Sequence, residues 1–378
     1  MTARGCWDWV EPGRALEALA AHAPDAFLTP AVPGMRASGL IGLWPRAQWR
    51  LDPAWTPEAA RADLARFCAD AGGPVLGYLG YGAGLAGLGL PGLDQPDQED
   101  GFPPGVFRAY HALLAPTPDG RGLRLLAGRS EDVRRIREAF AAHAPLPGSS
   151  PGLAPRLGGG LRASLDAHGY RAAVRRALNH ILDGDVYQLN LSIRFAADWP
   201  GDLTPQALFA HLLRTKPAPF YVLFDTGGHV LCSTSPERFL QVRRGRVLSQ
   251  PIKGTRAAGP DPSASARELL ASAKEDAELS MIVDLIRNDI SPHCAYGSVG
   301  VRGHKSLTLA DGLWQMYANV TGRMRPGSTA LDLLWDALPP GSVTGCPKAR
   351  AAEIIAALEP HRRGPYCGCL ALTHGPND

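Results

Sequence analysis

One lysine and one glutamate stand where an amine and an acid could act together. Lys253 lies in the stretch QPIKGT, between an apolar pair and a glycine turn, and Glu237 precedes it by sixteen residues in SPERFL. Both stretches have the pattern of strand ends, and if the strands pair as a hairpin around residues 243–245, both side chains approach one end of a sheet. A protonated carboxyl group can then donate a proton to a leaving group while a neutral amine attacks.

To attack, Lys253 must be neutral, so its pKa must fall from about 10.4 towards about 7 or 8. An apolar wall around the amine would lower that pKa, and we expect the nearby charge of Arg256 to act in the same direction. The alternative is an exposed ion pair between Glu237 and Lys253, which is the commoner fate of such residues.

A further carboxylate lies in a helix predicted over residues 276–290, DAELSMIVDLIRNDI. At about 100° per residue, Glu278 falls between Ile282 and Leu285, at the centre of the apolar stripe. A carboxylate there is costly unless it is paired or bound to metal, so a buried ion pair and a metal ligand both remain open. Asp289 lies on the same face, but near the helix end, where we expect it to cap the helix or meet solvent.

The stretch 341–360, GSVTGCPKARAAEIIAALEP, predicts a loop of glycines and hydroxyl groups followed by a helix. Pro347 suits the start of that helix and Pro360 its end. A Gly/Ser/Thr loop that opens a helix can bind an anion such as a carboxylate or a phosphate. A plain turn is the alternative.

The elements that must position these residues predict an α+β fold with mainly antiparallel sheet. Residues 166–182 have helical spacing, with Asp166 as the N-cap, and residues 185–192 alternate as a strand does. Residues 218–224 and 229–233 predict a hairpin. Strands and helices are segregated along the chain rather than alternating, which favours antiparallel sheet over a doubly wound parallel fold.

The Pro-, Gly- and Ser-rich stretch 145–160 predicts a linker between an amino-terminal region, 1–144, and a catalytic region, 161–378.

Residues 82–87, GAGLAG, match a dinucleotide-binding fingerprint. That fingerprint needs a helix directly after it, and the following residues, LGLPGLDQP, predict none, so we do not assign it that role.

Composition excludes several classes of protein. The chain has 378 residues, 45% of them hydrophobic and 20% charged, as in ordinary globular proteins. A net charge of +3 without a dense basic run gives no reason to expect nucleic-acid binding. The start of the chain has no signal-peptide core, and no apolar stretch is long enough to span a membrane. Seven cysteines, an odd number, indicate reduced thiols, so we expect a cytoplasmic protein.

Five motifs occur in a fixed order: DVYQLNLS, SPERFL, QPIKGTR, KEDAE…MIVDLIRND and GSVTGCPKARAAEII. Together they resemble the chorismate-utilising enzymes, which include anthranilate synthase component I, aminodeoxychorismate synthase component I, isochorismate synthase and salicylate synthase. The likeness covers about residues 161–370 and, more faintly, the amino-terminal part. It implies two large, mostly antiparallel sheets packed in one sandwich with helices outside.

The lysine after Pro-Ile resembles the aminodeoxychorismate synthases, where anthranilate synthases typically have alanine. The resemblance implies that Lys253 adds to chorismate at C2 and expels the C4 hydroxyl, with Glu237 as the general acid. Ammonia then adds at C4 and displaces the lysine. The product is 4-amino-4-deoxychorismate, on the route to p-aminobenzoate and folate.

The resemblance also assigns residues around the substrate. Glu278 matches a magnesium-binding glutamate, and Mg²⁺ between it and a dicarboxylate substrate would remove their repulsion. Gly254, Thr255, Thr344 and Gly345 match positions that surround the substrate carboxylates. Ammonia is expected from a separate glutamine amidotransferase subunit.

Three departures from the family pattern bear on activity. Gln315 stands where a histidine is usual, and Asp276 where an arginine is usual. Family members also continue several dozen residues beyond the strand after residue 366, with a second metal-binding glutamate, a substrate-binding arginine and a glycine-rich loop. We therefore expect a C-terminally truncated chain with little or no activity. Anthranilate synthase component I and a non-catalytic remnant remain the alternatives.

Overall fold

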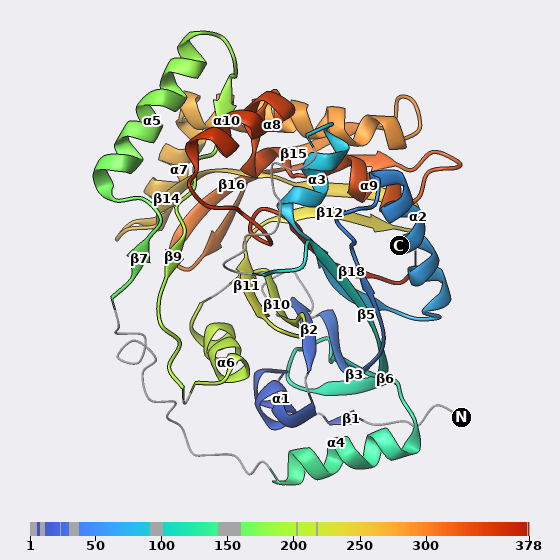
Figure 1. Cartoon of the computed structure of the whole chain (residues 1–378). Coiled ribbons are helices and arrows are strands. Elements are labelled where there is room, and N and C mark those ends of the chain that lie inside the picture. The colour runs from blue at the N-terminus through green and yellow to red at the C-terminus, as the bar shows by residue number, and fades with distance from the viewer. Residues whose placement is uncertain are drawn as a thin grey trace.

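The computed structural model describes residues 6–7, 12–22, 24–29, 38–90, 101–142, 160–201, 203–216, 218–375 and 377 (Figure 1). The predicted linker 145–160 lies outside the described residues except for Gly160. All pairings between the described strands are antiparallel, and most of these strands belong to two sheets with helices around them. The predicted α+β fold with mainly antiparallel sheet is thus confirmed.

Within the described residues, the larger sheet has nine strands. Its strands are β1 (Cys6–Trp7), β2 (Asp25–Thr29), β3 (Ser38–Arg50), β4 (Val75–Leu79), β5 (Gly105–Pro116), β6 (Leu123–Ala127), β10 (Phe220–Asp225), β11 (Val230–Ser235) and β18 (Cys369–Thr373). The strand order is β1-β6-β5-β3-β2-β10-β11, and β4 pairs with both β5 and β18. The regions 1–144 and 161–378 therefore supply strands to the same sheet.

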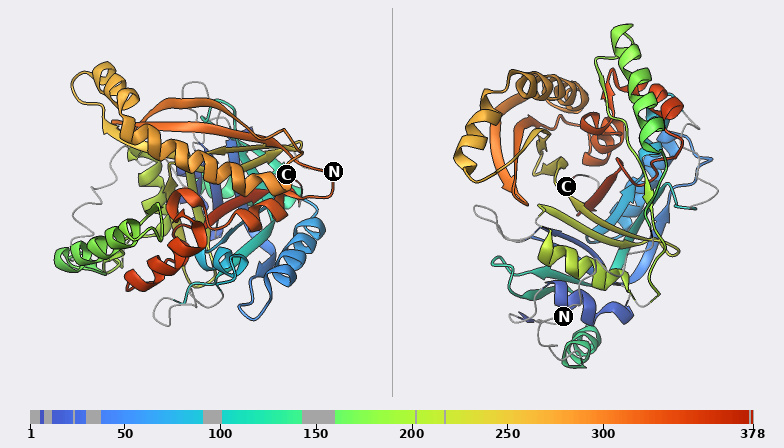
Figure 2. Two further views of the ribbon diagram at one scale, coloured as in Figure 1. Left: turned by 90° about the horizontal axis from the view of Figure 1, so that it is seen from above. Right: turned by 90° about the vertical axis from the view of Figure 1, so that its left-hand side faces the viewer.

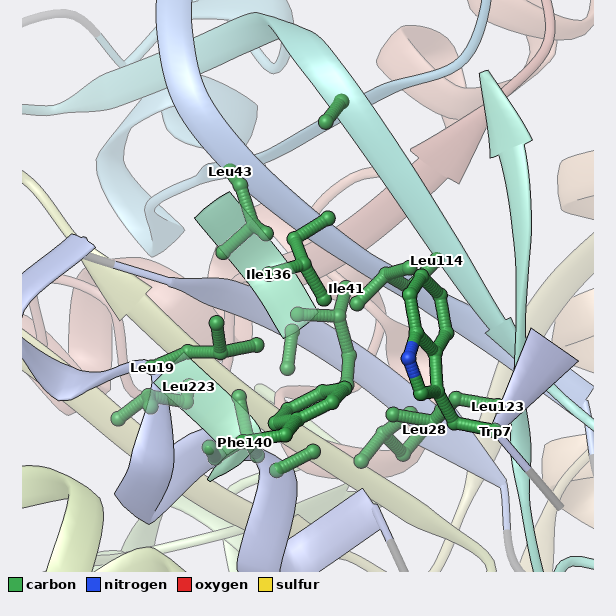
Figure 3. Close-up of a cluster of buried hydrophobic side chains, with 14 of the residues drawn as sticks. Trp7, Leu19, Leu28, Ile41, Leu43, Leu114, Leu123, Ile136, Phe140 and Leu223 are labelled. Atoms are coloured by element: carbon green, nitrogen blue, oxygen red, sulfur yellow. The ribbon is translucent and has the colours of Figure 1, made fainter. Parts of the chain in front are cut away.

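One face of the larger sheet is covered by helices α1 (Pro12–Ala18), α4 (Ser130–Ala142) and α6 (Pro205–Thr215) (Figures 1 and 3). Alternate residues of each strand point to this face, as the period of a strand requires. Ile41, for example, packs against Leu114 and Ile136 on the helix side, whereas its neighbour Leu40 belongs to a second cluster. The sheet is thus apolar on both faces, and its strands β2, β4 and β5 are buried nearly throughout.

The smaller sheet carries the predicted acid and amine. Its strands are β12 (Arg238–Arg243), β13 (Arg246–Gln250), β14 (Ile252–Ala257), β15 (Gly300–Ala310) and β16 (Leu313–Arg323). The predicted hairpin around residues 243–245 is confirmed, because β12 pairs with β13 and the turn residues Arg244 and Gly245 both have positive φ. β14 does not join this hairpin. It pairs with β16, which also pairs with β13 and β15.

Helix α7 (Pro262–Ala271) and helix α8 (Ala273–Ile290) cover the outer face of the smaller sheet (Figure 2). α8 begins at the N-cap Ser272, whose hydroxyl accepts from the Glu275 amide. Its buried side chains pack against Met316, Ala318 and Val320 of β16. The helix predicted over residues 276–290 is confirmed, with three further residues at its start.

The remaining described elements are helices and short strands outside these two sheets. They are η1 (Ala20–His22), α2 (Pro57–Asp70), α3 (Tyr81–Gly87), β7 (Arg162–Ala163), α5 (Ala167–Leu182), β8 (Gln188–Leu189), β9 (Phe195–Ala196), η2 (Ser291–His293), α9 (Ala330–Ala337), η3 (Gly341–Val343), β17 (Gly345–Cys346) and α10 (Lys348–Leu358). Within the described part of the chain, none of the helices combines the length and the apolar character needed to cross a lipid bilayer.

Three sequence predictions about these elements can be compared with the structure. Helix α5 starts as expected, with the Asp166 carboxylate accepting from the Gly169 amide at 2.6 Å. The strand expected over residues 185–192 is mostly wrong, because only Gln188–Leu189 pairs, with β17. The GAGLAG glycines lie inside α3, which ends at Gly87.

Candidate active site

Glu237 and Lys253 meet at Ser342, in the turn η3. Glu237 directly precedes β12, and Lys253 is the second residue of β14. The Ser342 hydroxyl donates to Glu237 Oε1 at 2.5 Å, and Lys253 Nζ donates to the Ser342 carbonyl oxygen at 3.0 Å. Ser342 is only 5% exposed. The structure therefore brings the predicted acid and the predicted amine to a single buried residue.

Burial raises the pKa of Glu237 to about 7. Three interactions oppose this rise: the hydrogen bond from Ser342, the charge of Lys253 and a hydrogen bond from the Ile252 amide. Because desolvation outweighs them, the carboxyl group is close to half protonated at neutral pH. A group in this state can serve as a general acid.

Burial also lowers the pKa of Lys253, against the charges of Glu237, Glu278 and Glu275, which raise it. The expected contribution of Arg256 is wrong, because its guanidinium forms an ion pair with Glu268 and the charges acting on Lys253 are carboxylates. Desolvation alone moves the amine towards its neutral form. Both members of the pair are thus displaced towards lower charge, as the predicted chemistry requires.

Glu278 lies beside the apolar stripe of α8 and not at its centre, which corrects the helical-wheel prediction. The buried residues are Leu279, Ile282, Val283, Ile286 and Ile290. Glu278 is displaced from them towards Lys253, with its side chain 35% exposed and Oε1 3.7 Å from Lys274 Nζ. It needs no buried partner, because water reaches it.

The donor set around Lys253 fits a magnesium ion shared with a substrate. Mg²⁺ keeps several waters and is usually held by one or two carboxylates together with substrate oxygens. Glu278 is such a carboxylate, and Glu275, one turn earlier on α8, also acts on Lys253. No group of three or more His, Cys, Asp or Glu side chains suited to a metal occurs in the described part of the chain. A site built from protein ligands alone is therefore not indicated there.

Two of the predicted substrate-binding residues continue from the turn that holds Ser342. Thr344 is fully buried, and its hydroxyl donates to the Pro340 carbonyl at 3.0 Å. Gly345 has φ +152°, and a Cβ at this position would lie 2.3 Å from the Gln188 main-chain oxygen. Only glycine allows β8 to approach so closely. These two residues therefore follow directly after the turn whose Ser342 contacts the acid and the amine.

The other two substrate-binding predictions flank Lys253 on β14. Gly254 has φ +82°, and a Cβ there would meet Glu275 Oε2 at 3.1 Å. Thr255 is exposed and lies opposite Gln315 in the pairing of β14 with β16. The departure at Gln315 is thus two residues along the strand from the amine. No described contact joins Thr255 to Ser342 or to Glu237.

Two acidic residues of α8 are neutralised by cations. Asp276 bonds Lys305 Nζ at 2.8 Å and His304 Nε2 at 3.3 Å, so Lys305 of β15 neutralises its charge. Asp289 was expected to cap the helix or meet solvent, which is wrong. Its largely buried carboxylate accepts from Lys348 Nζ at 2.8 Å, and the same amine donates to the Ala337 carbonyl at 2.9 Å.

Sequence reasoning missed the role of Ser342 and the side chains behind it. Asn190, Glu359 and Arg363 all hydrogen bond to the turn or to one another. The spacing of Glu359 and Arg363 was the available signal, but a pair four residues apart usually indicates an exposed helix face. Nothing in the local pattern indicated that this pair is buried.

Comparison with known families agrees with this geometry. Residues 41–378 match a family described as chorismate binding enzyme. The chain belongs to that family. The match covers the smaller sheet, most of the larger sheet and every site residue named above, so the site geometry can be interpreted within one family.

Individual relatives fall into two groups. Anthranilate synthase component 1 of Thermus thermophilus is 35% identical over 96% of this chain and 83% of its own length. Aminodeoxychorismate synthase component 1 of Salmonella typhimurium is 38% identical over 79% of this chain. The matched part covers only 64% of the length of the Salmonella protein. The crystal structure of anthranilate synthase component I from Streptococcus pneumoniae superposes with a TM-score of 0.74 at 25% identity, over 92% of this chain and 82% of that one. The fold of this family member is thus that of the component I synthases.

Proposed function

We propose that this family member is an aminodeoxychorismate synthase component I, which converts chorismate and ammonia to 4-amino-4-deoxychorismate. The observation that carries the proposal is the amine of Lys253, whose pKa burial lowers and which is joined to the buried acid Glu237 through Ser342. A lysine in such a position has a nucleophile's environment rather than a surface lysine's. The identity to the Salmonella aminodeoxychorismate synthase supports the same activity.

In the proposed reaction, the amine of Lys253 forms a bond to C2 of chorismate while the C4–oxygen bond breaks. Glu237 gives its proton to the departing hydroxyl, which leaves as water, and the two conjugated ring double bonds shift from C1–C2 and C5–C6 to C1–C6 and C4–C5. Ammonia then bonds to C4, both double bonds shift back, and the C2–nitrogen bond breaks to release the neutral lysine. The new ammonium group returns a proton to Glu237. The sum is chorismate plus ammonia giving 4-amino-4-deoxychorismate plus water.

The burial of Glu237 and Ser342 gives each a role in this reaction. Glu237 keeps its proton in a substantial fraction of molecules at neutral pH because burial raises its pKa to about 7, and Ser342 orients that carboxyl group through a 2.5 Å hydrogen bond. Thr344 and Gly345 would face the carboxylates of the substrate from the same turn. Mg²⁺, held by Glu278, would supply the positive charge that lets a dicarboxylate approach this helix. Ammonia would come from a glutamine amidotransferase partner.

The test is turnover of chorismate with ammonium and Mg²⁺, with products identified by mass and fluorescence. Whatever rate the wild-type chain reaches, we expect its product to be 4-amino-4-deoxychorismate, and we expect Lys253→Ala to lower that rate by about a thousandfold or more. Lys216→Ala is the matched control, because Lys216 is exposed and pairs with Asp311. Normal product formation by Lys253→Ala would exclude covalent catalysis by this lysine.

Anthranilate synthase component I is the second candidate, since the Thermus relative is 35% identical over nearly the whole chain. Fluorescent anthranilate in the same assay would favour it. Chorismate binding without either product would identify the chain as a binding protein and exclude both activities.

A further inference from the structure

The turn that contacts the acid and the amine is fastened to the segment around β8 by Asn190. The Asn190 amide donates to the Thr344 carbonyl at 2.9 Å, and its side-chain Nδ2 donates to the Ser342 carbonyl at 3.1 Å. The Ser342 carbonyl thus accepts from Asn190 and from Lys253. Two donors on one carbonyl fix its direction more closely than either would alone.

Arg363 bonds to both sides of this junction with one guanidinium group. Its Nη1 donates to the Val343 carbonyl at 2.9 Å, and its Nη2 donates to the Asn190 carbonyl at 2.6 Å. The guanidinium carbon also lies 4.9 Å from the centre of the Tyr81 ring. The side chain is 2% exposed, so water does not compete for these acceptors.

Glu359 holds Arg363 in place with both carboxylate oxygens. Arg363 Nε donates to Oε2 at 3.0 Å and Nη2 to Oε1 at 2.8 Å, and the Glu359 side chain is 2% exposed. The amide and the hydroxyl of Ser192 also donate to Oε1, at 2.7 and 2.8 Å. A buried bidentate pair of this kind adds geometric specificity. It adds little net stability over apolar residues of the same shape, so its contribution here is a fixed arrangement of its neighbours.

We propose that the buried Glu359–Arg363 pair is a positioning unit for catalysis, which acts through Asn190 and Val343 on Ser342. Its function is to hold the turn so that the Ser342 hydroxyl reaches Glu237 while the Ser342 carbonyl reaches Lys253. Neither Glu359 nor Arg363 is a catalytic residue, because the described contacts reach the acid and the amine only through Ser342. The effect of this pair on catalysis rests on the proposed function. Its effect on the position of the turn rests on the hydrogen bonds alone.

Hydrogen–deuterium exchange tests the hold without any need for turnover. In Arg363→Lys, which keeps the charge and loses the bidentate fork, we expect exchange in peptides covering 186–192 and 341–346 to quicken by about tenfold or more. Arg108→Lys is the matched control, since Arg108 is also buried and bonds a buried carboxylate, that of Asp25. It should quicken exchange near residues 25–29 and leave the two site peptides unchanged. Unchanged exchange at the site in Arg363→Lys would overturn the proposal.

A double-mutant cycle on kcat tests the route through Ser342, measured on chains of matched folded fraction. If both residues act on one contact, the double variant Ser342→Ala/Arg363→Lys should lose no more than about threefold beyond the larger single loss. Losses that multiply would overturn the route through Ser342. A general loss of folding would not produce this non-additive result. As the control, the losses of kcat in Arg108→Lys and Ser342→Ala should multiply in the double variant.

Asn190→Ala keeps the inference testable if Arg363→Lys does not fold. It removes only the side-chain bond to the Ser342 carbonyl and keeps the main-chain bond to Thr344. We expect faster exchange at 341–346 and a lower kcat; unchanged values of both would contradict the proposal. A wild-type chain without turnover would defeat the proposed function, and the exchange measurements would still decide whether the pair holds the turn.

Discussion

Glu237 and Lys253 depart from their ordinary pKa values for the same physical reason, because both are buried beside Ser342. Each charge stabilises the other, so the two groups titrate as a coupled pair rather than independently. The productive form has a proton on Glu237 and none on Lys253. Its population falls at low pH, where the amine gains a proton, and at high pH, where the acid loses one.

The pH profile of kcat/KM should therefore be bell-shaped, and Glu237→Gln should remove its alkaline limb. In the wild-type chain the rate should fall at alkaline pH, because Glu237, whose pKa is about 7, has then lost its proton. Glutamine cannot donate the proton, so we expect kcat to fall by about 10²- to 10⁴-fold and to stop decreasing with rising pH. A variant that keeps the alkaline limb would show that another group supplies the proton.

Ser342→Ala should move the alkaline limb of the pH profile to higher pH, whereas a loss of burial around Glu237 would move it to lower pH. The hydroxyl lowers the pKa of Glu237 by donating a hydrogen bond to it, so its removal from a site that stays dry raises that pKa. We expect the alkaline limb to move to higher pH by about one unit, since a hydrogen bond to a charged group contributes about 1.5–3 kcal/mol. Ser298→Ala, which removes a hydroxyl bonded to the Arg323 carbonyl, is the control. A shift to lower pH would mean that water enters and that Ser342 mainly excludes it.

At the scale of elements, the site turn depends on how closely α3 and α9 approach. A Cβ on Gly84 of α3 would lie 2.4 Å from the Pro339 nitrogen and 2.5 Å from the Leu338 carbonyl carbon, both directly after α9. We expect Gly84→Ala to lower the free energy of unfolding by about 1–3 kcal/mol through overpacking. Gly87→Ala is the matched control in the same helix, because a Cβ there meets only the Trp335 carbonyl oxygen at 4.0 Å.

Chemical denaturation of the two variants checks this prediction. Gly87→Ala should be neutral or stabilising by up to about 1 kcal/mol, since glycine in a helix costs conformational entropy. Equal stability of Gly84→Ala and Gly87→Ala would show that the turn after α9 shifts freely. In that case the approach of the two helices would not fix the position of residues 341–345.

Local patterns predicted most elements, and they failed where one segment has two neighbours. The helix over residues 276–290 was clear from its period, but its wheel placed Glu278 at the centre of the buried face. Leu285 was counted as core, whereas it lies against Gly341 of the site turn. α8 packs against β16 on one face and against η3 on another, so its apolar side chains point towards two different neighbours. A single hydrophobic stripe cannot represent both.

The pairing of Glu237 with Lys253 was predictable because a short hairpin separates them in the chain. Ser342, Asn190 and Arg363 were not, because they converge from three segments that no local pattern connects. Residues 185–192 show the same limit. Leu189 and Leu191 do alternate inward, but they pack against α5 and α10 rather than within a sheet, and Tyr187 is 75% exposed.

At the scale of the whole molecule, the larger sheet joins the regions 1–144 and 161–378 through buried charge. Asp25 of β2 accepts from Arg108 at 3.2 Å and from the Tyr110 hydroxyl at 2.7 Å, both on β5. It also accepts from the Asp225 amide on β10 at 2.7 Å. One fully buried carboxylate thus connects strands from both regions. We expect the two regions to unfold together, because β2 pairs with β3 on one side and β10 on the other.

The stability of the molecule should carry the titration of this carboxylate. Burial raises the pKa of Asp25 to about 6, from an ordinary value of 3.8. The folded chain therefore binds its proton more tightly than the unfolded chain does. The resulting stability is fully present below pH 3.8 and is lost as the pH rises through about 6. Relative to Asp25→Asn, the wild type should lose about 2 kcal/mol of unfolding free energy between pH 4 and pH 7. Urea denaturation across this range measures the difference, and Asp198→Asn is the control, since Asp198 is exposed and its pKa is lowered. A difference between wild type and Asp25→Asn that stays constant with pH would show that Asp25 remains ionised throughout, held by Arg108 and Tyr110 against the cost of its burial.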